Sequence, residues 1–134
     1  MHDAEPLVVL VVEDEWLISD MIASSLRDAG YLVLEIGSGD AAVSLLRQGG
    51  HFDILLTDIN LGPGATSWDV GEAFRAANPR KPIIYASGNP ADLNRQVSDS
   101  LFFKKPYQPA AIVHACGNGG AAAGFPSWQE SVRR

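Results

Sequence analysis

The sequence predicts an α/β fold, a three-layer sandwich in which a parallel five-stranded sheet is covered by helices on both faces. Runs rich in Val, Ile and Leu alternate along the chain with segments whose apolar residues recur at helical spacing. The strand-like runs are apolar throughout, which is typical of strands buried on both faces. Clusters of Gly, Pro and Asn separate these segments. With 134 residues, the chain suits one domain with one core.

The first half of the chain carries three predicted strands and two predicted helices. Leu17, Met21, Ile22 and Leu26 supply the helical spacing of the first helix, and Gly30 is a typical C-terminal stop. Asp40 is a candidate N-cap for the second helix. These signals place strands at 7–12, 31–36 and 54–58 and helices at 16–29 and 40–47.

The second half of the chain carries shorter elements. The loop at 61–67 is rich in Gly and Pro and is expected to be mobile. Pro109 suits the first turn of a last helix, and the segment at 91–97 allows only a short polar helix. The remaining elements are strands at 82–86 and 100–103 and helices at 68–77 and 109–116.

One folded domain is expected at 7–116, preceded by an N-terminal extension at 1–6. The segment at 117–134 begins with Gly and Ala residues and shows no clear period, so it is expected to be a partly disordered tail. No output domain is expected after it.

Composition argues against several kinds of partner. A net charge of -6 without a basic face argues against direct binding of nucleic acid. No apolar segment is long enough to span a bilayer, and the N-terminus is too polar for a signal peptide. The lone Cys116 forms no internal disulfide, which favours a reducing, cytoplasmic location.

Polar residues follow the predicted strands at their carboxyl ends. Because the carboxyl ends of parallel strands lie along one edge of a sheet, these residues are expected to meet in one cleft. Each is unremarkable alone, and an acidic strand end taken alone is more often a solvated turn than a cation site. Their convergence is the signal: Glu13 and Asp14 follow the first strand, Asp58 the third, Ser87 the fourth, and Lys105 comes after the fifth.

These residue types suit phosphoryl transfer to a carboxylate. Asp58 can attack phosphorus, but repulsion between two anions opposes the attack, so catalysis depends on positioning and charge neutralisation. Mg²⁺ prefers oxygen ligands, which here are the carboxylates of Glu13, Asp14 and Asp58 and the backbone carbonyl of Asn60. Lys105 can offset charge on the phosphoryl oxygens, and the hydroxyl of Ser87 can donate a hydrogen bond to one of them.

On these residues the chain resembles the receiver domain of response regulators in two-component signalling, over about residues 7–116. The resemblance implies a flavodoxin-like sheet in the order 2-1-3-4-5. It implies that Asp58 accepts a phosphoryl group from a sensor histidine kinase or phosphotransfer protein with Mg²⁺ bound. Enzymatic activity is then limited to Mg²⁺-dependent autophosphorylation and autodephosphorylation. Ser87 and Phe102 match the family's switch pair, a hydroxyl and an aromatic ring that move on phosphorylation.

The same resemblance makes the chain a single-domain regulator, acting as a phosphate relay or sink or by binding a downstream protein at 89–104. Two positions depart from the common pattern: Glu13 replaces the usual Asp, and Phe102 lacks the hydroxyl of the frequent Tyr. The run from Tyr85 to Gly88 resembles a subfamily with an aromatic-Ala-Thr/Ser-Gly motif. Regulators of that subfamily work with HWE-type histidine kinases.

Two other functions fit parts of the pattern. An aspartate-nucleophile phosphatase of the haloacid-dehalogenase type needs a second acid two residues after the nucleophile, where this chain has Asn60. A degenerate receiver would serve only as a docking module, although no expected site residue is missing. A Rossmann-type nucleotide binder is disfavoured because no Gly-rich turn follows the first strand.

Overall fold

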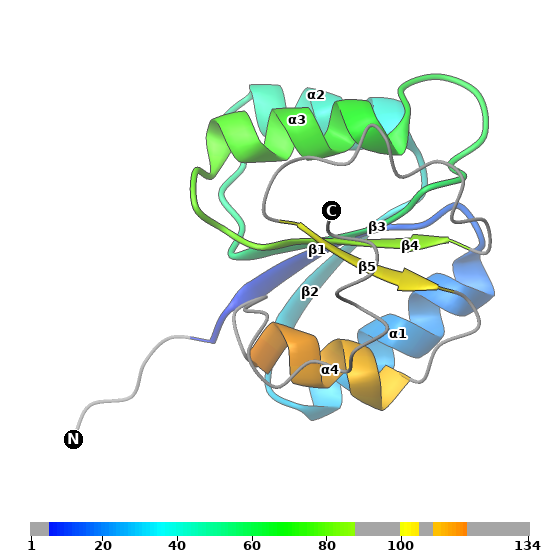
Figure 1. The fold of residues 1–134 in the computed structure, drawn as a ribbon, viewed down its shortest axis with the longest axis vertical. Helices are drawn as coiled ribbons and strands as arrows, with labels where there is room; N and C mark the ends of the chain where they lie inside the picture. Colours follow the sequence, from blue (N-terminus) through cyan, green and yellow to red (C-terminus); the bar gives the residue numbers. More distant parts are fainter. Residues whose placement is uncertain (1–5, 88–99, 105–108, 118–134) are drawn as a thin grey trace.

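A computed structural model describes residues 6–87, 100–104 and 109–117, with only the backbone described at 87, 102–104 and 109. The predicted helix at 91–97, Lys105, the tail after Gly117 and most of the N-terminal extension lie outside the described residues. The described elements, shown in Figure 1, are β1 (Val8–Val12), α1 (Trp16–Asp28), β2 (Leu32–Ile36), α2 (Gly39–Arg47), β3 (Ile54–Asp58), α3 (Ser67–Ala77), β4 (Ile83–Ser87), β5 (Leu101–Lys104) and α4 (Pro109–Gly117).

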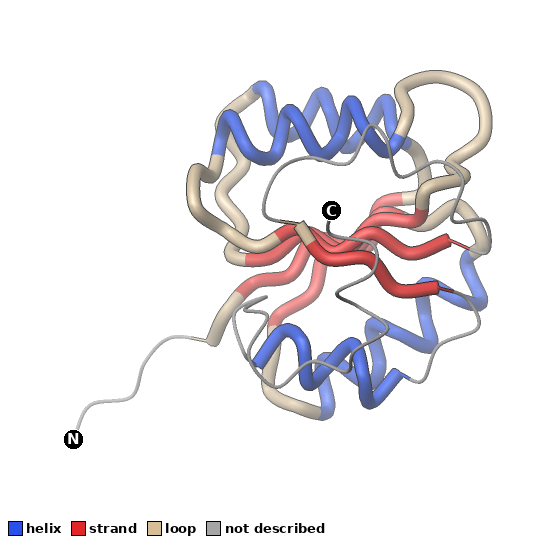
Figure 2. Tube along the Cα trace, viewed as in Figure 1, coloured by secondary structure: helices blue, strands red, loops and turns tan. Residues whose placement is uncertain are grey.

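The sheet is parallel and its strand order is β2-β1-β3-β4-β5, so the predicted flavodoxin-like order is confirmed. Figures 1 and 2 show the strands as a central layer with α2 and α3 on one side and α1 and α4 on the other. Register places Val12 beside Thr57 and Asp58 beside Ala86, so β1, β3 and β4 end close to one another.

Strand residues alternate between two hydrophobic cores, one on each face of the sheet. On β1, Leu10 and Val12 pack with α2 and α3, whereas Val9 and Val11 pack with α1 and α4. Tyr85 on β4 is fully buried and packs against Trp68 of α3, with ring centroids 4.9 Å apart. Both faces of the central strands are covered, which explains why their sequences are apolar throughout.

Helix α1 buries only some of the apolar residues that predicted it. Its buried residues are Ser19, Ile22, Ala23 and Leu26, whereas Leu17 and Met21 are exposed. Ser19 can be buried because its hydroxyl donates a hydrogen bond to Oε1 of Glu35 on β2 at 2.7 Å. The predicted helix is confirmed, and of the four apolar residues that predicted it only Ile22 and Leu26 face the core.

The N-cap of α2 also differs from the prediction. The cap is Ser38, whose Oγ accepts a hydrogen bond from the backbone N–H of Ala41 at 3.1 Å, and the helix begins at Gly39. Asp40, the predicted cap, lies one residue inside the helix and bonds to a distant loop instead. Helix α3 begins with a capping box between Thr66 and Asp69.

Within the described part of the chain, no helix is both long and apolar enough to cross a membrane.

Candidate functional site

Three carboxylates meet at the carboxyl ends of β1 and β3. Glu13 and Asp14 directly follow β1, and Asp58 is the last residue of β3. Each offers a carboxylate oxygen, and these oxygens lie within 4.8 Å of one another. The structure therefore brings together the three acids that the sequence predicted as metal ligands.

Two of the three acids are almost completely buried. Glu13 is 4% exposed and Asp58 is 6% exposed, while Asp14 is open to solvent. Burying a carboxylate is costly, and two of them close together add repulsion, unless a cation or hydrogen bonds compensate. Oε2 of Glu13 accepts a hydrogen bond from the backbone N–H of Glu15 at 3.2 Å. A set of hard oxygen donors with one side open to water is the chemistry that Mg²⁺ requires.

Backbone hydrogen bonds hold the acids in place. The N–H of Glu13 donates to the carbonyl of Ile36 on β2 at 3.0 Å. The N–H of Ile59, directly after Asp58, donates to the carbonyl of Ala86 on β4 at 2.9 Å. The sheet thus continues one residue past each strand end, and both acids project from rigid backbone.

The loop after β3 passes beside the acids. Asn60, whose carbonyl was predicted as a further ligand, is exposed in this loop. Gly62 has φ of +80°, and a Cβ placed on it would lie 3.6 Å from Oδ2 of Asp14. At Gly62 the loop therefore presents backbone, and no side chain, to the carboxylate of Asp14.

The other predicted site residues are described only in part. Ser87 ends β4 one residue after Ala86, the register partner of Asp58, but its side chain is not described. Phe102 pairs with Tyr85 across β4 and β5, and its side chain is likewise not described. Lys105 lies outside the described residues, directly after β5.

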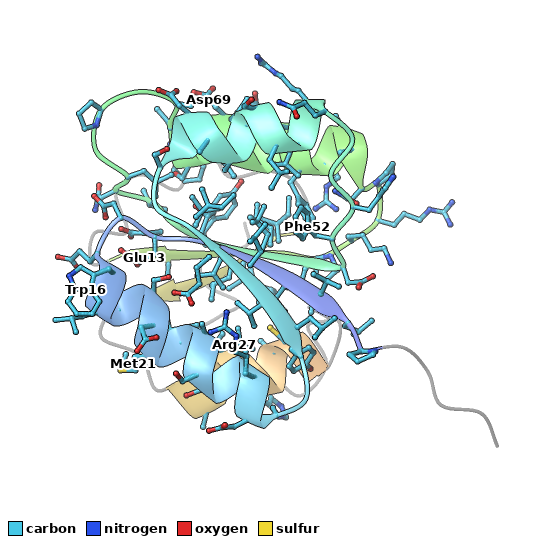
Figure 3. The ribbon with its side chains drawn as sticks, turned by 180° about the vertical axis from the view of Figure 1, so that it is seen from behind. Glu13, Trp16, Met21, Arg27, Phe52 and Asp69 are labelled. Carbon is cyan, nitrogen blue, oxygen red and sulfur yellow. The ribbon has the colours of Figure 1, made fainter. Side chains whose placement is uncertain are left out.

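An apolar surface that the sequence analysis missed lies next to the acids. Trp16 and Leu17, in the first turn of α1, are 73% and 66% exposed, and Met21 lies one turn further along. Figure 3 shows Trp16 at the same end of the sheet as Glu13. We call these three residues the α1 face. The sequence did contain a signal for this surface, because Leu17 and Met21 lie on a different side of the helix from Ile22 and Leu26.

Cys116 is a free cysteine buried in α4. Burial raises the pKa of this thiol to about 12, so it stays protonated at neutral pH.

Comparison with known proteins decides the family. Residues 9–116 match the response regulator receiver domain family. The chain belongs to this family. Receiver domains bind Mg²⁺ at an acidic site and interact with histidine kinases or phosphotransfer proteins, and this chain has an acidic cluster of Glu13, Asp14 and Asp58.

Curated relatives of this receiver domain include longer proteins. It is 30% identical over 89 residues to the probable transcriptional regulatory protein TcrX of Mycobacterium tuberculosis, a match to 66% of this chain and 37% of the relative. It is 30% identical over 109 residues to the sensory transduction protein RegX3 of Mycolicibacterium smegmatis, a match to 78% of this chain and 46% of the relative. The matches thus cover less than half the length of either relative.

Solved structures share the fold over most of the chain. A response regulator receiver protein from Sinorhizobium medicae superposes with a TM-score of 0.79 at 32% identity, covering 85% of this chain and 94% of that one. The receiver domain of the sensor histidine kinase PA1611 from Pseudomonas aeruginosa, which has a magnesium ion coordinated in its active-site cleft, superposes with a TM-score of 0.73 at 25% identity. That match covers 87% of this chain and 99% of the PA1611 domain.

Proposed function

We propose that this receiver domain accepts a phosphoryl group on Asp58 from a sensor histidine kinase or phosphotransfer protein. The ligands for Mg²⁺ are then Glu13, Asp14, Asp58 and the backbone carbonyl of Asn60. The observation that carries the proposal is the meeting of three carboxylates from two strands within 4.8 Å, two of them buried. Buried like charges have no stabilising role in a core, so their retention favours a cation-binding function.

Asp58 is the acid best placed to be the nucleophile. It ends the central strand β3, and the main-chain bond from Ile59 to Ala86 fixes the backbone directly after it. In the transfer, a carboxylate oxygen of Asp58 forms a bond to phosphorus as the nitrogen–phosphorus bond of the donor histidine breaks. The electron pair of that bond stays on the imidazole nitrogen. The bound metal supplies positive charge that reduces the repulsion between the two anions.

Lys105 and Ser87 complete the proposed site. Lys105 would neutralise phosphoryl charge, and Ser87 would donate a hydrogen bond to a phosphoryl oxygen. Ser87 and Phe102 would then act as the switch pair. The backbone supports this assignment, because β4 ends beside Asp58 and Phe102 pairs with Tyr85 on that strand. The downstream partner would bind at 89–104, a segment that lies mostly outside the described residues.

The α1 face is the proposed contact for the phosphodonor protein. Exposed large apolar side chains grouped beside a functional site are typical of protein contacts. Trp16 and Leu17 follow Asp14 and Glu15 directly, so a donor that covers them also reaches the acids. Acetyl phosphate needs no such contact, which allows the two steps to be tested separately.

The pathway assignments rest on the sequence alone. The aromatic-Ala-Ser-Gly run from Tyr85 to Gly88 supports pairing with an HWE-type kinase, and phosphotransfer profiling against the kinases of the source organism tests it. Action as a stand-alone relay or sink, a cytoplasmic location and the absence of a direct nucleic-acid partner also stay predictions. Relatives such as TcrX are named transcriptional regulatory proteins, so DNA binding by the purified chain is worth measuring.

Mass spectrometry after incubation with acetyl phosphate and Mg²⁺ tests the proposal. The expected result is a gain of one phosphoryl group that is absent in Asp58→Asn. No gain, with binding partners still retained, would favour a degenerate docking module. Rapid hydrolysis of small phosphoesters would favour the phosphatase, although Asn60 provides no general acid for it.

A further inference from the structure

The loop that follows Asp58 is tied at its far end to helix α2. Oδ1 of Asp40, in the first turn of α2, accepts a hydrogen bond from the backbone N–H of Ala65 at 2.8 Å. The two residues are 25 positions apart, so the bond joins segments that are separate in sequence. Because the acceptor is a carboxylate, the bond is stronger than one between neutral groups.

Two glycines allow the loop to approach α2 this closely. A Cβ on Gly39 would collide with the backbone carbonyl oxygen of Ala65, and one on Gly64 would come within 2.5 Å of Oδ2 of Asp40. Gly64 also has φ of +98°, a conformation that other residues rarely adopt. The sequence and the backbone are both adapted to keep the loop against Asp40.

The near end of the same loop lies at the acids. Gly62 lies against the carboxylate of Asp14, and Asn60 precedes it by two residues. Between them, Leu61 is buried in the core beneath α2 and α3. The loop is therefore anchored by the buried Leu61 and by the bond to Asp40, and Gly62 between these anchors lies beside Asp14.

We propose that Asp40 is a positioning residue for the metal site. By holding Ala65, it limits the conformations of residues 62–65, and with them the space beside Asp14 that the bound ion needs. This inference rests on the proposed function, because it concerns the same site. Without the bond, the loop samples more conformations, and ordering it when Mg²⁺ binds costs conformational entropy. Mg²⁺ then binds more weakly.

Three variants of the full chain test this inference. Asp40→Ala removes the acceptor, Asp40→Asn keeps a neutral acceptor oxygen, and Ser38→Ala is the matched control. Ser38 caps the same helix, and its hydroxyl bonds within the helix rather than to the loop. Calorimetric titration gives the Mg²⁺ affinity, and hydrogen exchange followed by NMR gives the protection of the Ala65 amide without Mg²⁺.

In Asp40→Ala we expect faster hydrogen exchange at the Ala65 amide. We also expect the Mg²⁺ affinity to fall by about tenfold, which is the smallest loss typical when a group that orients metal ligands is removed. Asp40→Asn should recover part of both losses. Ser38→Ala should lower the melting temperature but keep the wild-type Mg²⁺ affinity.

Two results would overturn the positioning role. Faster exchange with unchanged Mg²⁺ affinity would mean that the bond exists but does not position the site, and unchanged exchange would mean that the bond does not hold the loop in solution. If the wild-type protein binds no Mg²⁺, the proposed function itself fails and takes this role with it. That failure is recognised in the wild-type titration, before any variant is compared.

Discussion

At the scale of single residues, the burial of Glu13 and Asp58 affects the free energy of unfolding of the metal-free protein. Two buried acids and the nearby Asp14 repel one another when no cation is present. The unfolded chain separates these charges, so the repulsion lowers the free energy of unfolding. A site built for a cation is therefore expected to trade stability for metal affinity.

We predict that Asp58→Asn stabilises the metal-free protein by about 1–3 kcal/mol, because it removes one of three neighbouring charges. The same change should abolish most of the extra stability that Mg²⁺ gives to the wild type, since ligand binding stabilises only the state that binds. Thermal unfolding with EDTA and with Mg²⁺ measures both effects. Asp20→Asn, an exposed change on α1, is the control. A destabilised Asp58→Asn protein in EDTA would refute the repulsion argument.

A second buried residue, Cys116, makes the stability of the protein depend on pH. Burial raises its pKa from 9.0 to about 12 in the folded protein, while the thiol of the unfolded chain ionises near its ordinary value. The folded state therefore holds its proton in a pH range where the unfolded state releases it. The contribution to stability is complete below about pH 9 and is lost as the pH rises from 9 towards 12.

We predict that Cys116→Ala flattens the loss of stability above pH 9. Denaturant unfolding of both proteins between pH 8 and about pH 10.5 measures the difference. Parallel stability curves for the two proteins would mean that the thiol is not shielded as the structure indicates. A thiol reagent at pH 8 should likewise react with the wild type only after unfolding.

At the scale of elements, α1 carries both a buried side and an exposed apolar side. Its exposed side begins at Trp16, two residues after Asp14, and so lies where we propose that the phosphodonor protein binds. The exposed apolar residues of β2, Leu32 and Leu34, belong to the edge strand of the sheet instead. Both groups are apolar and exposed, but they differ in position, so substitutions in β2 serve as controls for substitutions in α1.

We predict that Leu17→Ser slows phosphotransfer from the cognate kinase by about tenfold, the effect of losing about 1.4 kcal/mol of contact energy. Phosphorylation by acetyl phosphate should keep its wild-type rate, because the acids are unchanged. Leu32→Ser should alter neither rate. Equal slowing with both donors would show that the substitution disturbs the site, and equal effects of Leu17→Ser and Leu32→Ser would exclude a specific α1 contact.

At the scale of the whole molecule, the hydrophobic pattern of the sequence was enough to predict the parallel sheet and the edge at which its strands end. Strands buried on both faces leave a plain apolar signal, and parallel strands bring their ends together whatever the loops do. The meeting of Glu13, Asp14 and Asp58 could therefore be predicted before any coordinates. The family match over residues 9–116 agrees with the family that the sequence resembled.

The errors came from contacts between distant segments. Ser38 and Asp40 are both residue types that commonly cap helices. In the structure Ser38 is the cap, whereas Asp40 accepts a long-range hydrogen bond from the N–H of Ala65. Asn78 follows the end of α3, as the helix predicted at 68–77 requires, but its role is long-range: its side chain is buried and accepts a hydrogen bond from the N–H of Phe52 at 3.1 Å. Local patterns contain no information about such partners.

The most direct test is the Mg²⁺ dependence of phosphorylation by acetyl phosphate in the wild type, in Glu13→Gln and in Glu15→Gln. Glu15 is exposed beside the site and outside the acid cluster, so it is the matched control. We expect saturable dependence on Mg²⁺ in the wild type and in Glu15→Gln, and a requirement for about tenfold more Mg²⁺ in Glu13→Gln. Phosphorylation of Asp58 at the same rate in EDTA as in Mg²⁺ would contradict the central claim.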